Sequence, residues 1–321
     1  MKEFELGLKS ALKALTASRK VMIVSHRNPD GDTLGCMLAL GLALIQKGKK
    51  VYLVCHDAVP TRFQFLPGSE LVQSECREKI DVAVAMDCGS DQQLGDVRAS
   101  FMKARTTIQV DHHDFGDAFG KIQVLDPGAA AVGEIVYHLV RALKVEITPA
   151  IATCLLTSII VDTGAFRFSN IRPQTFEICA RLSKKGVDMQ HLIEESYWVK
   201  SRAMALLSSH AMLNAKFSKD GSVAWAVVSQ SSIHRYGANL SDADTVADDL
   251  RSIQGVNVAA LFRETERGNY RVSLRSKKSI HVATVAKRFG GGGHHNSAGC
   301  SIGRAASDRK KLLKALEELV V

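Results

Sequence analysis

The stretch from residue 21 to residue 49, "VMIVSHRNPDGDTLGCMLALGLALIQKGK", decides the expected fold. It begins with a short apolar run, passes through a polar turn that contains Pro and Gly, and continues with apolar residues at helical spacing. A strand, a turn and a helix in this order form the first part of a βαβ unit, from which parallel sheets are built. The stretch therefore predicts an α/β domain.

Apolar runs of similar length recur along the first half of the chain. They are "KVYLVC" (50–55), "DVAVAM" (81–86) and "TTIQV" (106–110). Helical patterns follow at 131–143, 149–160 and 172–186. Short apolar strands that alternate with helices favour a parallel sheet covered on both faces. We predict an N-terminal parallel-sheet domain over residues 1–190.

The pattern changes in the last third of the chain. Residues 191–215 have the spacing of a helical linker, and three strand-like runs follow at 221–229, 256–264 and 269–276. The run "HVATVAKRF" (281–289) and the end of the chain again have helical spacing. We predict a smaller C-terminal α+β domain over residues 216–321, with an active-site cleft between the two domains.

The net charge of +9 is unevenly distributed over the 321 residues. Residues 1–199 hold 23 basic and 23 acidic residues, whereas residues 200–321 hold 19 basic and 10 acidic residues. A basic module joined to a neutral one indicates an anionic partner, and nucleic acid or a nucleotide is the first expectation. The alternative on charge alone is a solvated, Lys-rich surface.

The cysteines and the apolar runs indicate the compartment. The seven cysteines are scattered and form no C-x-x-C pair, which is typical of reduced thiols in a cytosol. The apolar runs fall short of the ~18–20 residues of a membrane helix, and the N-terminus has the pattern of an amphipathic helix. We therefore expect a cytoplasmic protein that does not enter a membrane.

Four polar turns carry the candidate chemistry, and each directly follows an apolar run. They are "SHRNPDGD" (25–32), "DCGS" (87–90), "DHH" (111–113) and "DTGAF" (162–166). The carboxyl ends of parallel strands lie along one edge of a sheet, where open α/β folds bind ligands. Three of the turns would lie at strand ends, and the fourth would be brought to the same edge by its helix. That edge would gather these residues: His26, Asp30, Asp32, Asp87, Asp111, His112, His113 and Asp162.

So many carboxylates repel one another unless cations neutralise them. Five acids and three imidazoles exceed the four ligands of a structural zinc, so a pair of divalent ions fits better. Mixed imidazole and carboxylate ligands favour Mn²⁺, with Mg²⁺ and Co²⁺ as alternatives. Two such ions activate water and hold phosphoryl oxygens for in-line attack.

Each of these turns also has a plainer interpretation. A single Asp after a strand is most often a helix cap or a turn residue, and "PDGD" is an ordinary turn sequence. We interpret His56 and Asp57, which follow the run at 50–55, as turn residues only. The functional interpretation rests on the four turns taken together.

The run "FGGGGHHNSAG" (289–299) is the second signal. Consecutive glycines allow positive φ and a close approach of the backbone to a ligand, and their N–H groups can cradle a phosphate. A flexible loop is the alternative, although a linker rarely carries two His, an Asn and a Ser directly after it. Arg275, in "SLRS" (273–276), is a candidate bidentate partner for phosphate or a base.

These motifs resemble those of a known family. "SHRNPDGDTLG", "MDCGS", "VDHHDF" and "VDTGAFRF" are similar, in this order, to the four motifs of the DHH phosphoesterases. "RVSLRS" and "FGGGGHHNSAG" resemble the GGGH signature of the DHH-associated C-terminal domain. The whole pattern is most similar to the two-domain nano-RNase and pAp-phosphatase branch, although Ser297 stands where the family usually has Ala.

The resemblance implies a role for each matching residue. His26 and Asp30 would hold one Mn²⁺, the group Asp32, His112 and Asp162 would hold a second, and Asp87 would bridge the two. His113 would face the scissile phosphate, and Asp111 would orient a neighbouring imidazole. The implied substrate-binding residues are Arg275, Gly291, Gly292, Gly293, His294, Asn296 and Ser297.

The resemblance also implies the activity. We expect a Mn²⁺-dependent enzyme that hydrolyses short single-stranded oligonucleotides to mononucleotides, or 3′-phosphoadenosine 5′-phosphate (pAp) to AMP. A phosphodiesterase for linear or cyclic dinucleotides, such as pApA and cyclic di-AMP, is one alternative. A non-catalytic nucleotide-binding module is another. The sequence leaves open the end from which an oligonucleotide is degraded, and whether the protein is a homodimer.

Overall fold

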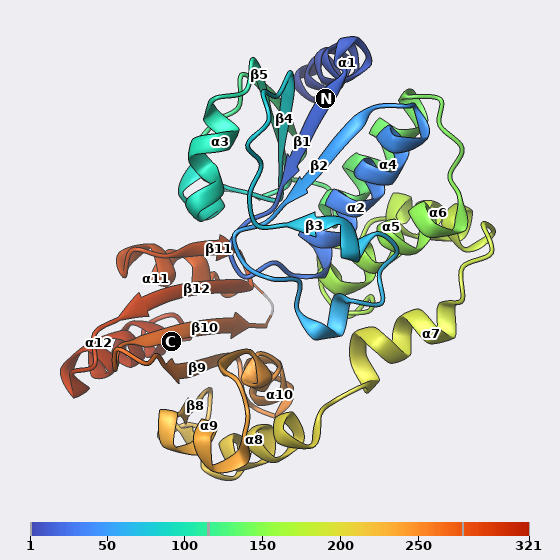
Figure 1. Cartoon of the computed structure of the whole chain (residues 1–321). Helices are drawn as coiled ribbons and strands as arrows, with labels where there is room; N and C mark the ends of the chain where they lie inside the picture. Colours follow the sequence, from blue (N-terminus) through green and yellow to red (C-terminus); the bar gives the residue numbers. More distant parts are fainter. Residues whose placement is uncertain (1, 114–115, 278, 321) are drawn as a thin grey trace. The chain divides into compact units, whose positions relative to one another are not determined.

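A six-stranded parallel sheet organises the first half of the chain (Figure 1). Its strand order is β3-β2-β1-β4-β5-β6. The strands are β1 (Lys20–Val24), β2 (Lys50–Val54), β3 (Val72–Gln73), β4 (Val82–Met86), β5 (Thr106–Asp111) and β6 (Ile122–Leu125). The predicted parallel α/β domain is confirmed, and the short strands β3 and β6 of this sheet were not predicted from the sequence.

The computed structural model describes residues 2–113, 116–277 and 279–320. The chain divides into two units, Met1–Val199 and Lys200–Val321. Residues 191–215, predicted as a linker, contribute to both units, because the helix Arg202–Leu213 buries Leu207 and Ala211 in the core of the second. Among the described residues, no helix has the length and apolar character needed to cross a membrane.

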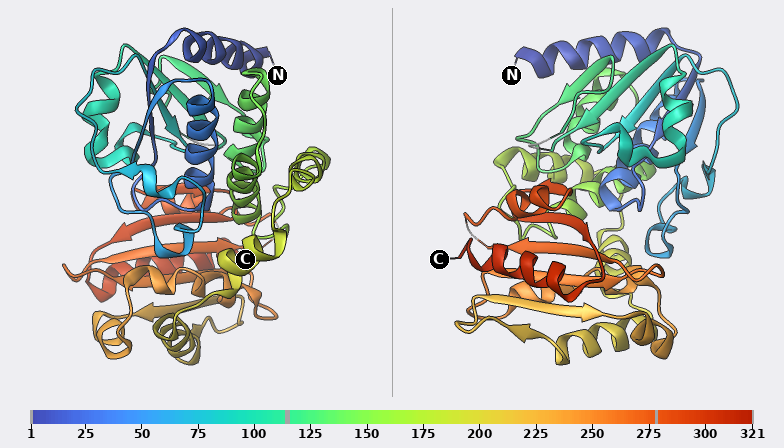
Figure 2. Two further views of the ribbon diagram at one scale, coloured as in Figure 1. Left: turned by 45° about the vertical axis from the view of Figure 1, so that its right-hand side comes forward. Right: turned by 90° about the vertical axis from the view of Figure 1, so that its left-hand side faces the viewer.

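Helices cover both faces of the first sheet. Those of the first unit are α1 (Lys2–Ala17), α2 (Gly31–Gln46), α3 (Arg98–Met102), α4 (Val132–Ala142), α5 (Pro149–Asp162), α6 (Pro173–Ser183) and α7 (Met189–Ile193). Alternate residues of β1 face opposite cores: Ile23 packs with α2, α4 and α5, whereas Met22 packs with Phe101 of α3. Figure 2 shows this three-layered arrangement from two further sides.

The closest helix packing in this unit joins α2 to α5. A Cβ on Gly35 of α2 would lie 2.4 Å from the carbonyl oxygen of Cys154 on α5, so only glycine fits there. The glycine lets the two helices approach until their backbones nearly touch, and this brings the end of α5 towards the edge of the sheet.

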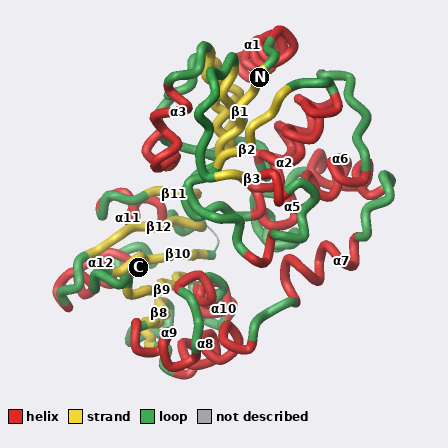
Figure 3. Tube along the Cα trace, in the orientation of Figure 1, coloured by secondary structure: helices red, strands yellow, loops and turns green. Residues whose placement is uncertain are grey.

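The second unit contains a mostly antiparallel sheet with the order β11-β12-β10-β9-β8-β7, drawn in yellow among red helices in Figure 3. Its strands are β7 (Lys216–Phe217), β8 (Val223–Val228), β9 (Val258–Glu264), β10 (Tyr270–Ser276), β11 (Gly292–His294) and β12 (Ser297–Ile302). Its helices are α8 (Arg202–Leu213), α9 (Gln230–Tyr236), α10 (Val246–Ser252), α11 (Val282–Arg288) and α12 (Ala306–Glu317). The predicted C-terminal α+β domain is therefore confirmed.

Candidate metal centre

The candidate residues of the first unit meet at the carboxyl edge of its sheet. The loop 25–30 follows β1, Asp87 follows β4, and Asp111 is the last residue of β5. Asp162 is the last residue of α5 and comes from a helix rather than a strand. The structure thus brings together side chains that are up to 136 positions apart in the sequence.

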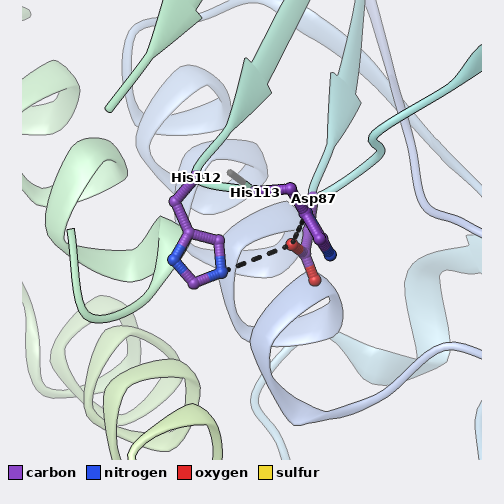
Figure 4. A group of neighbouring side chains, drawn as sticks. All are labelled: Asp87, His112 and His113. Carbon is purple, nitrogen blue, oxygen red and sulfur yellow. Dashed lines mark ion pairs between the residues drawn. The ribbon is translucent and has the colours of Figure 1, made fainter. Parts of the chain in front are cut away.

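Three overlapping groups of side chains have metal-ligand spacing. They are His26 with Asp30 and Asp87, Asp32 with His112 and Asp162, and Asp87 with His112 and His113. Within each group the potential ligand atoms lie within 4.8 Å of one another. Asp87 belongs to two of the groups, and the dashed lines in Figure 4 mark its ion pairs with His112 and His113.

The two carboxylate oxygens of Asp87 face different partners. Its Oδ2 lies 3.6 Å from Nε2 of His26, and its Oδ1 lies 3.8 Å from Nε2 of His112 and 3.5 Å from Nδ1 of His113. Oδ1 is buried and accepts no hydrogen bond from the described residues. A buried carboxylate oxygen in this situation fits a cation ligand.

The second group converges on one imidazole nitrogen. Nε2 of His112 lies 3.4 Å from Oδ2 of Asp162 and 3.7 Å from Oδ2 of Asp32. Nδ1 of His112 donates to the carbonyl oxygen of Ala129 at 2.9 Å, which turns Nε2 towards the carboxylates. A backbone acceptor behind a ligating imidazole is the usual arrangement at metal sites.

Asp111 lies behind the other histidine of the pair. Its Oδ1 is 2.7 Å from Nδ1 of His113 and also accepts the backbone N–H of His112 at 2.9 Å. Asp111 is therefore in contact with the imidazole that it was predicted to orient, and it lies outside the three groups with metal-ligand spacing.

The pKa values reflect this concentration of charge. Burial raises the pKa of Asp162 to about 7, and burial together with Asp87 and Asp162 raises the pKa of Asp32 well above its usual range. Burial lowers the pKa values of His26 and His112, but neighbouring carboxylates outweigh it and raise both to about 10. In the metal-free protein, protons bound to these groups therefore reduce the repulsion between the carboxylates. Divalent cations would replace those protons.

The backbone around the cluster is strained at several points. Asp87 and Asn28 have φ values of 56° and 53°, and Ala165 and Phe166, shortly after Thr163, have φ values of 56° and 64°. A left-handed conformation costs about 1–2 kcal/mol for a residue with a side chain. Such strain concentrates at functional sites, where the surrounding structure enforces it.

The residues that support the ligands were not predicted from the sequence. Ser158 Oγ and Cys36 Sγ donate to Oδ1 of Asp32, at 2.5 and 3.2 Å, and the backbone N–H of Val132 donates to its Oδ2 at 3.0 Å. The contacts of Ser158 and Val132 join elements distant in sequence, whereas Cys36 lies one turn after Asp32 on α2. Ser158 could have been noted because it lies one helical turn before Asp162.

Asp57 is a second omission. Its Oδ2 accepts the backbone N–H of Asn28 at 2.7 Å, in the loop that carries His26 and Asp30. The residue interpreted as a simple turn element therefore supports the candidate site. Asp30 has two roles, since its Oδ1 caps α2 by accepting the N–H groups of Asp32 and Thr33 at 3.0 Å each.

The candidate substrate-binding residues lie in the second unit. Ser297 of β12 pairs with Arg275 of β10 on one side and with His294 of β11 on the other. Nε of Arg275 lies 3.3 Å from Oδ2 of Asp248. The side chain of His294 lies outside the described part of the structure.

Only the second half of the glycine run, Gly292 and Gly293, belongs to the edge strand β11. A Cβ at Gly291 would lie 2.0 Å from the carbonyl oxygen of Gly299, and Gly293 has a φ of 133°. At Gly292, by contrast, a Cβ would meet nothing within 4 Å. Asn296 donates to Ser276 Oγ at 2.8 Å and to the carbonyl oxygen of Ile280 at 3.1 Å, and so connects the β11–β12 turn to β10.

Two family models match the chain. The model described as "DHH family, N-terminal domain" matches residues 20–159, and the "DHHA1 domain" model matches residues 220–321.

Curated relatives match over almost the whole chain. A bifunctional oligoribonuclease and PAP phosphatase, NrnA, of Thermus thermophilus is 32% identical over 93% of this chain and 89% of its own length. A probable enzyme of the same description from Streptococcus mutans is 27% identical over 92% and 93% of the two chains. The cyclic-di-AMP phosphodiesterase GdpP of Geobacillus thermodenitrificans is 25% identical over 91% of this chain, but over only 46% of its own length.

Solved structures share the fold. An exopolyphosphatase-related protein of Bacteroides fragilis superposes with a TM-score of 0.89 at 24% identity, over 98% of this chain and 96% of its own. RecJ of Thermus thermophilus, solved with Mn²⁺, superposes with a TM-score of 0.55 at 14% identity, over 100% of this chain and 54% of its own.

Proposed function

The chain belongs to the DHH phosphoesterase family, a family of enzymes that hydrolyse phosphoester bonds, and from this premise we propose that it is a Mn²⁺-dependent hydrolase of short oligonucleotides and of pAp. The products are mononucleotides and AMP, respectively. The 32% identity to the NrnA of Thermus thermophilus over most of both chains supports this choice of substrates.

One structural observation carries the proposal. The buried carboxylate of Asp87 is shared between a group with His26 and Asp30 and a group with His112. We assign His26, Asp30 and Asp87 to one cation, and Asp32, Asp87, His112 and Asp162 to a second. Divalent cations bound there would act as Lewis acids that lower the pKa of water and neutralise phosphate charge.

We assign His113 to contact with the substrate and Asp111 to the orientation of His113. Burial lowers the pKa of His113, but the hydrogen bond and the negative charge of Asp111 raise it to about 9. Because Nδ1 of His113 is held by Asp111, we assign its Nε2–H to the scissile phosphate. There the imidazolium stabilises the developing negative charge and can protonate the leaving oxygen.

The C-terminal unit supplies substrate affinity in this proposal. Arg275, Gly291, Gly292, Gly293, His294, Asn296 and Ser297 bind the terminal phosphate or nucleotide. The excess of basic over acidic residues in 200–321 supports an anionic ligand there.

A dinucleotide phosphodiesterase is the second candidate. The 25% identity to the GdpP of Geobacillus thermodenitrificans favours it, although the match spans less than half of that protein. Cleavage of pApA or of cyclic di-AMP would need the same metal-binding residues, so only the preferred substrate separates the two candidates.

A substrate panel tests the proposal. We expect the purified protein with Mn²⁺ to release AMP from pAp and mononucleotides from a five-nucleotide RNA, and to lose both activities in EDTA. Rates would be compared with those for pApA and cyclic di-AMP. Preferential turnover of the last two compounds would favour the second candidate, and the absence of metal-dependent turnover of all four would contradict both.

A further inference from the structure

The segment that joins β6 to α4, residues 126–132, orients two of the candidate metal ligands through its main chain. The carbonyl oxygen of Ala129 accepts a hydrogen bond from Nδ1 of His112 at 2.9 Å, and the backbone N–H of Val132 donates to Oδ2 of Asp32 at 3.0 Å. The directions of this imidazole and this carboxylate therefore depend on where the main chain of the 126–132 segment lies.

Arg172, the residue before α6, contacts this segment at two points. Its Nη2 lies 2.6 Å from Oε2 of Glu134, in the first turn of α4, and 3.6 Å from Oδ2 of Asp126, at the start of the segment. A Cβ added to Gly128 would lie 3.0 Å from Nη1 of Arg172, so the guanidinium lies close to the main chain of the segment. Arg172 thus connects the start of the segment to the helical turn in which it ends.

The groups joined by this bridge are themselves held by hydrogen bonds. Glu134 is 2% exposed, and its Oε1 accepts from Thr175 Oγ1 at 2.5 Å. The same hydroxyl oxygen accepts the backbone N–H of Arg172 at 3.1 Å. Oδ1 of Asp126 accepts the backbone N–H of Gly128 at 3.1 Å. The bridge therefore connects ordered parts of α4, α6 and the 126–132 segment.

Asn170, two residues before Arg172, makes a parallel connection. Its Nδ2 donates to the carbonyl oxygen of Ala130 at 2.8 Å and to that of Asp162 at 3.2 Å. The chain just before α6 therefore holds the 126–132 segment with two side chains, and one of them also contacts the main chain of a third candidate ligand.

The charges around Arg172 argue against a direct role in substrate binding. An arginine near a phosphoesterase site could bind a substrate phosphate. Here two carboxylates face one guanidinium, so the group has a net negative charge and repels phosphate. The carboxylate of Glu134 is buried and would be left without a compensating charge if the arginine turned away. Arg172 therefore acts on other residues of the chain.

We propose that Arg172 is a positioning residue for the candidate cation group formed by Asp32, His112 and Asp162. Its bridge across the 126–132 segment fixes the two main-chain groups that orient the imidazole and the first carboxylate. The proposal rests on the proposed function in one respect, the assignment of these three residues to a cation. It assigns Arg172 no contact with the cation or with the substrate.

The direction of the effect on Mn²⁺ affinity tests this role. The full-length protein would be titrated with Mn²⁺ while the EPR signal of the free ion is recorded. On electrostatics alone, removal of a positive charge near a cation site strengthens cation binding. We expect Arg172→Met to weaken one Mn²⁺ binding event instead, by about three- to tenfold, because the ligands lose their orientation. The weakened event should be the one that His112→Ala abolishes.

Arg181 provides the matched control. It is exposed in the last turn of α6, so Arg181→Met removes the same charge from the same helix without touching the bridge. We expect this variant to bind Mn²⁺ as tightly as the wild-type protein or slightly more tightly. Arg172→Lys should restore most of the affinity lost in Arg172→Met, because it keeps a positive charge between the two carboxylates.

A double variant keeps the test decisive if Arg172→Met does not fold. Combining Arg172→Met with Glu134→Gln leaves the net charge of the protein unchanged and leaves no unpaired carboxylate at position 134. Electrostatics then predicts wild-type Mn²⁺ affinity, whereas a positioning role predicts the same weakening as in the single variant. Thermal unfolding without metal shows that the variant is folded.

The outcomes separate this inference from the proposed function. Unchanged or tighter Mn²⁺ binding in the folded Arg172 variants would overturn the positioning role and leave the proposed function standing. Equal weakening in Arg181→Met would also overturn it, because the effect would then not depend on the bridge. If the wild-type protein binds no Mn²⁺, the assignment of the cation groups fails, and the proposed function fails with it.

Discussion

The two units present their functional side chains in opposite ways. In the first unit, Asp32, Asp87 and His112 are at most 4% exposed and lie within hydrogen-bonding or ion-pair distance of further charged groups. In the second unit, the candidate substrate-binding residues Arg275, Asn296 and Ser297 are all partly exposed.

This difference separates two kinds of recognition. Charges buried in a low-dielectric cluster interact strongly and require compensation, by protons or by cations. Charges on an exposed face are screened by solvent and contribute modestly, one phosphate at a time. Substitutions of the buried groups in the first unit should therefore abolish most of the activity. Substitutions on the second sheet should reduce substrate affinity in small steps.

The largest expected effect is at Asp87. Asp87→Asn removes the charge of the one carboxylate that the two proposed cation groups share, while it keeps the size of the side chain. We expect kcat for a dinucleotide with Mn²⁺ to fall by about 10³-fold or more. Asp117→Asn, at an exposed position of the same unit, is the control and should be active. If kcat of Asp87→Asn stayed within tenfold of the wild-type value, the expected contrast between large effects in the first unit and small effects in the second would be wrong.

Two adjacent glycines sharpen the comparison within the second unit. Gly291→Ala forces a Cβ against the carbonyl oxygen of Gly299, so we expect a loss of about 1–3 kcal/mol in the free energy of unfolding. Gly292→Ala meets no atom within 4 Å and should change that free energy by less than about 0.5 kcal/mol. Urea denaturation of both variants measures the difference. A similar loss in both would mean that β11 does not pack as the structure shows.

The last prediction concerns a gradual dependence of cation binding on pH, which extends the comparison to the charge of the first unit. Asp162, with a pKa of about 7 in the metal-free protein, must be deprotonated to bind a cation, and His26 and His112, with pKa values of about 10, must release protons. Because all three pKa values are raised, the stability of the metal-free protein declines as pH rises through these values. The affinity for cations, by contrast, increases as pH rises.

The pH dependence can be measured by thermal unfolding. We expect the rise in Tm caused by Mn²⁺ to be larger at pH 8.5 than at pH 6.0, with an affinity gain on the order of tenfold per pH unit for each released proton. In Asp162→Asn this gain should be smaller, since one of the competing protons is gone. A Mn²⁺-induced shift in Tm that is independent of pH would contradict the assignment of these groups as ligands.

The sequence supported the main strands and the composition of the cluster. β4 is a continuous apolar run, β1 is apolar after Lys20, and β5 is rich in β-branched residues; a polar turn directly after each is visible without a structure. β11 and β12 were not predicted. They are rich in Gly and Ser, which have low strand propensity, and they form because they pair with each other and with β10.

The residues that support the candidate metal ligands could not be predicted from the sequence either. Ser158 reaches Asp32 only because Gly35 lets α5 approach α2, and Asp57 reaches Asn28 only because β1 and β2 are neighbours in the sheet. Such contacts join positions that no periodicity relates.

By itself, the sequence determined which residue types are available, in which order, and that three of the four acidic turns follow strands while the fourth follows a helix, because local spacing sets side-chain direction and the ends of elements. The tertiary structure alone decided that Asp87 is shared between two groups and that Arg172 bridges Asp126 and Glu134. These arrangements depend on strand order, register and helix packing, which arise from long-range contacts.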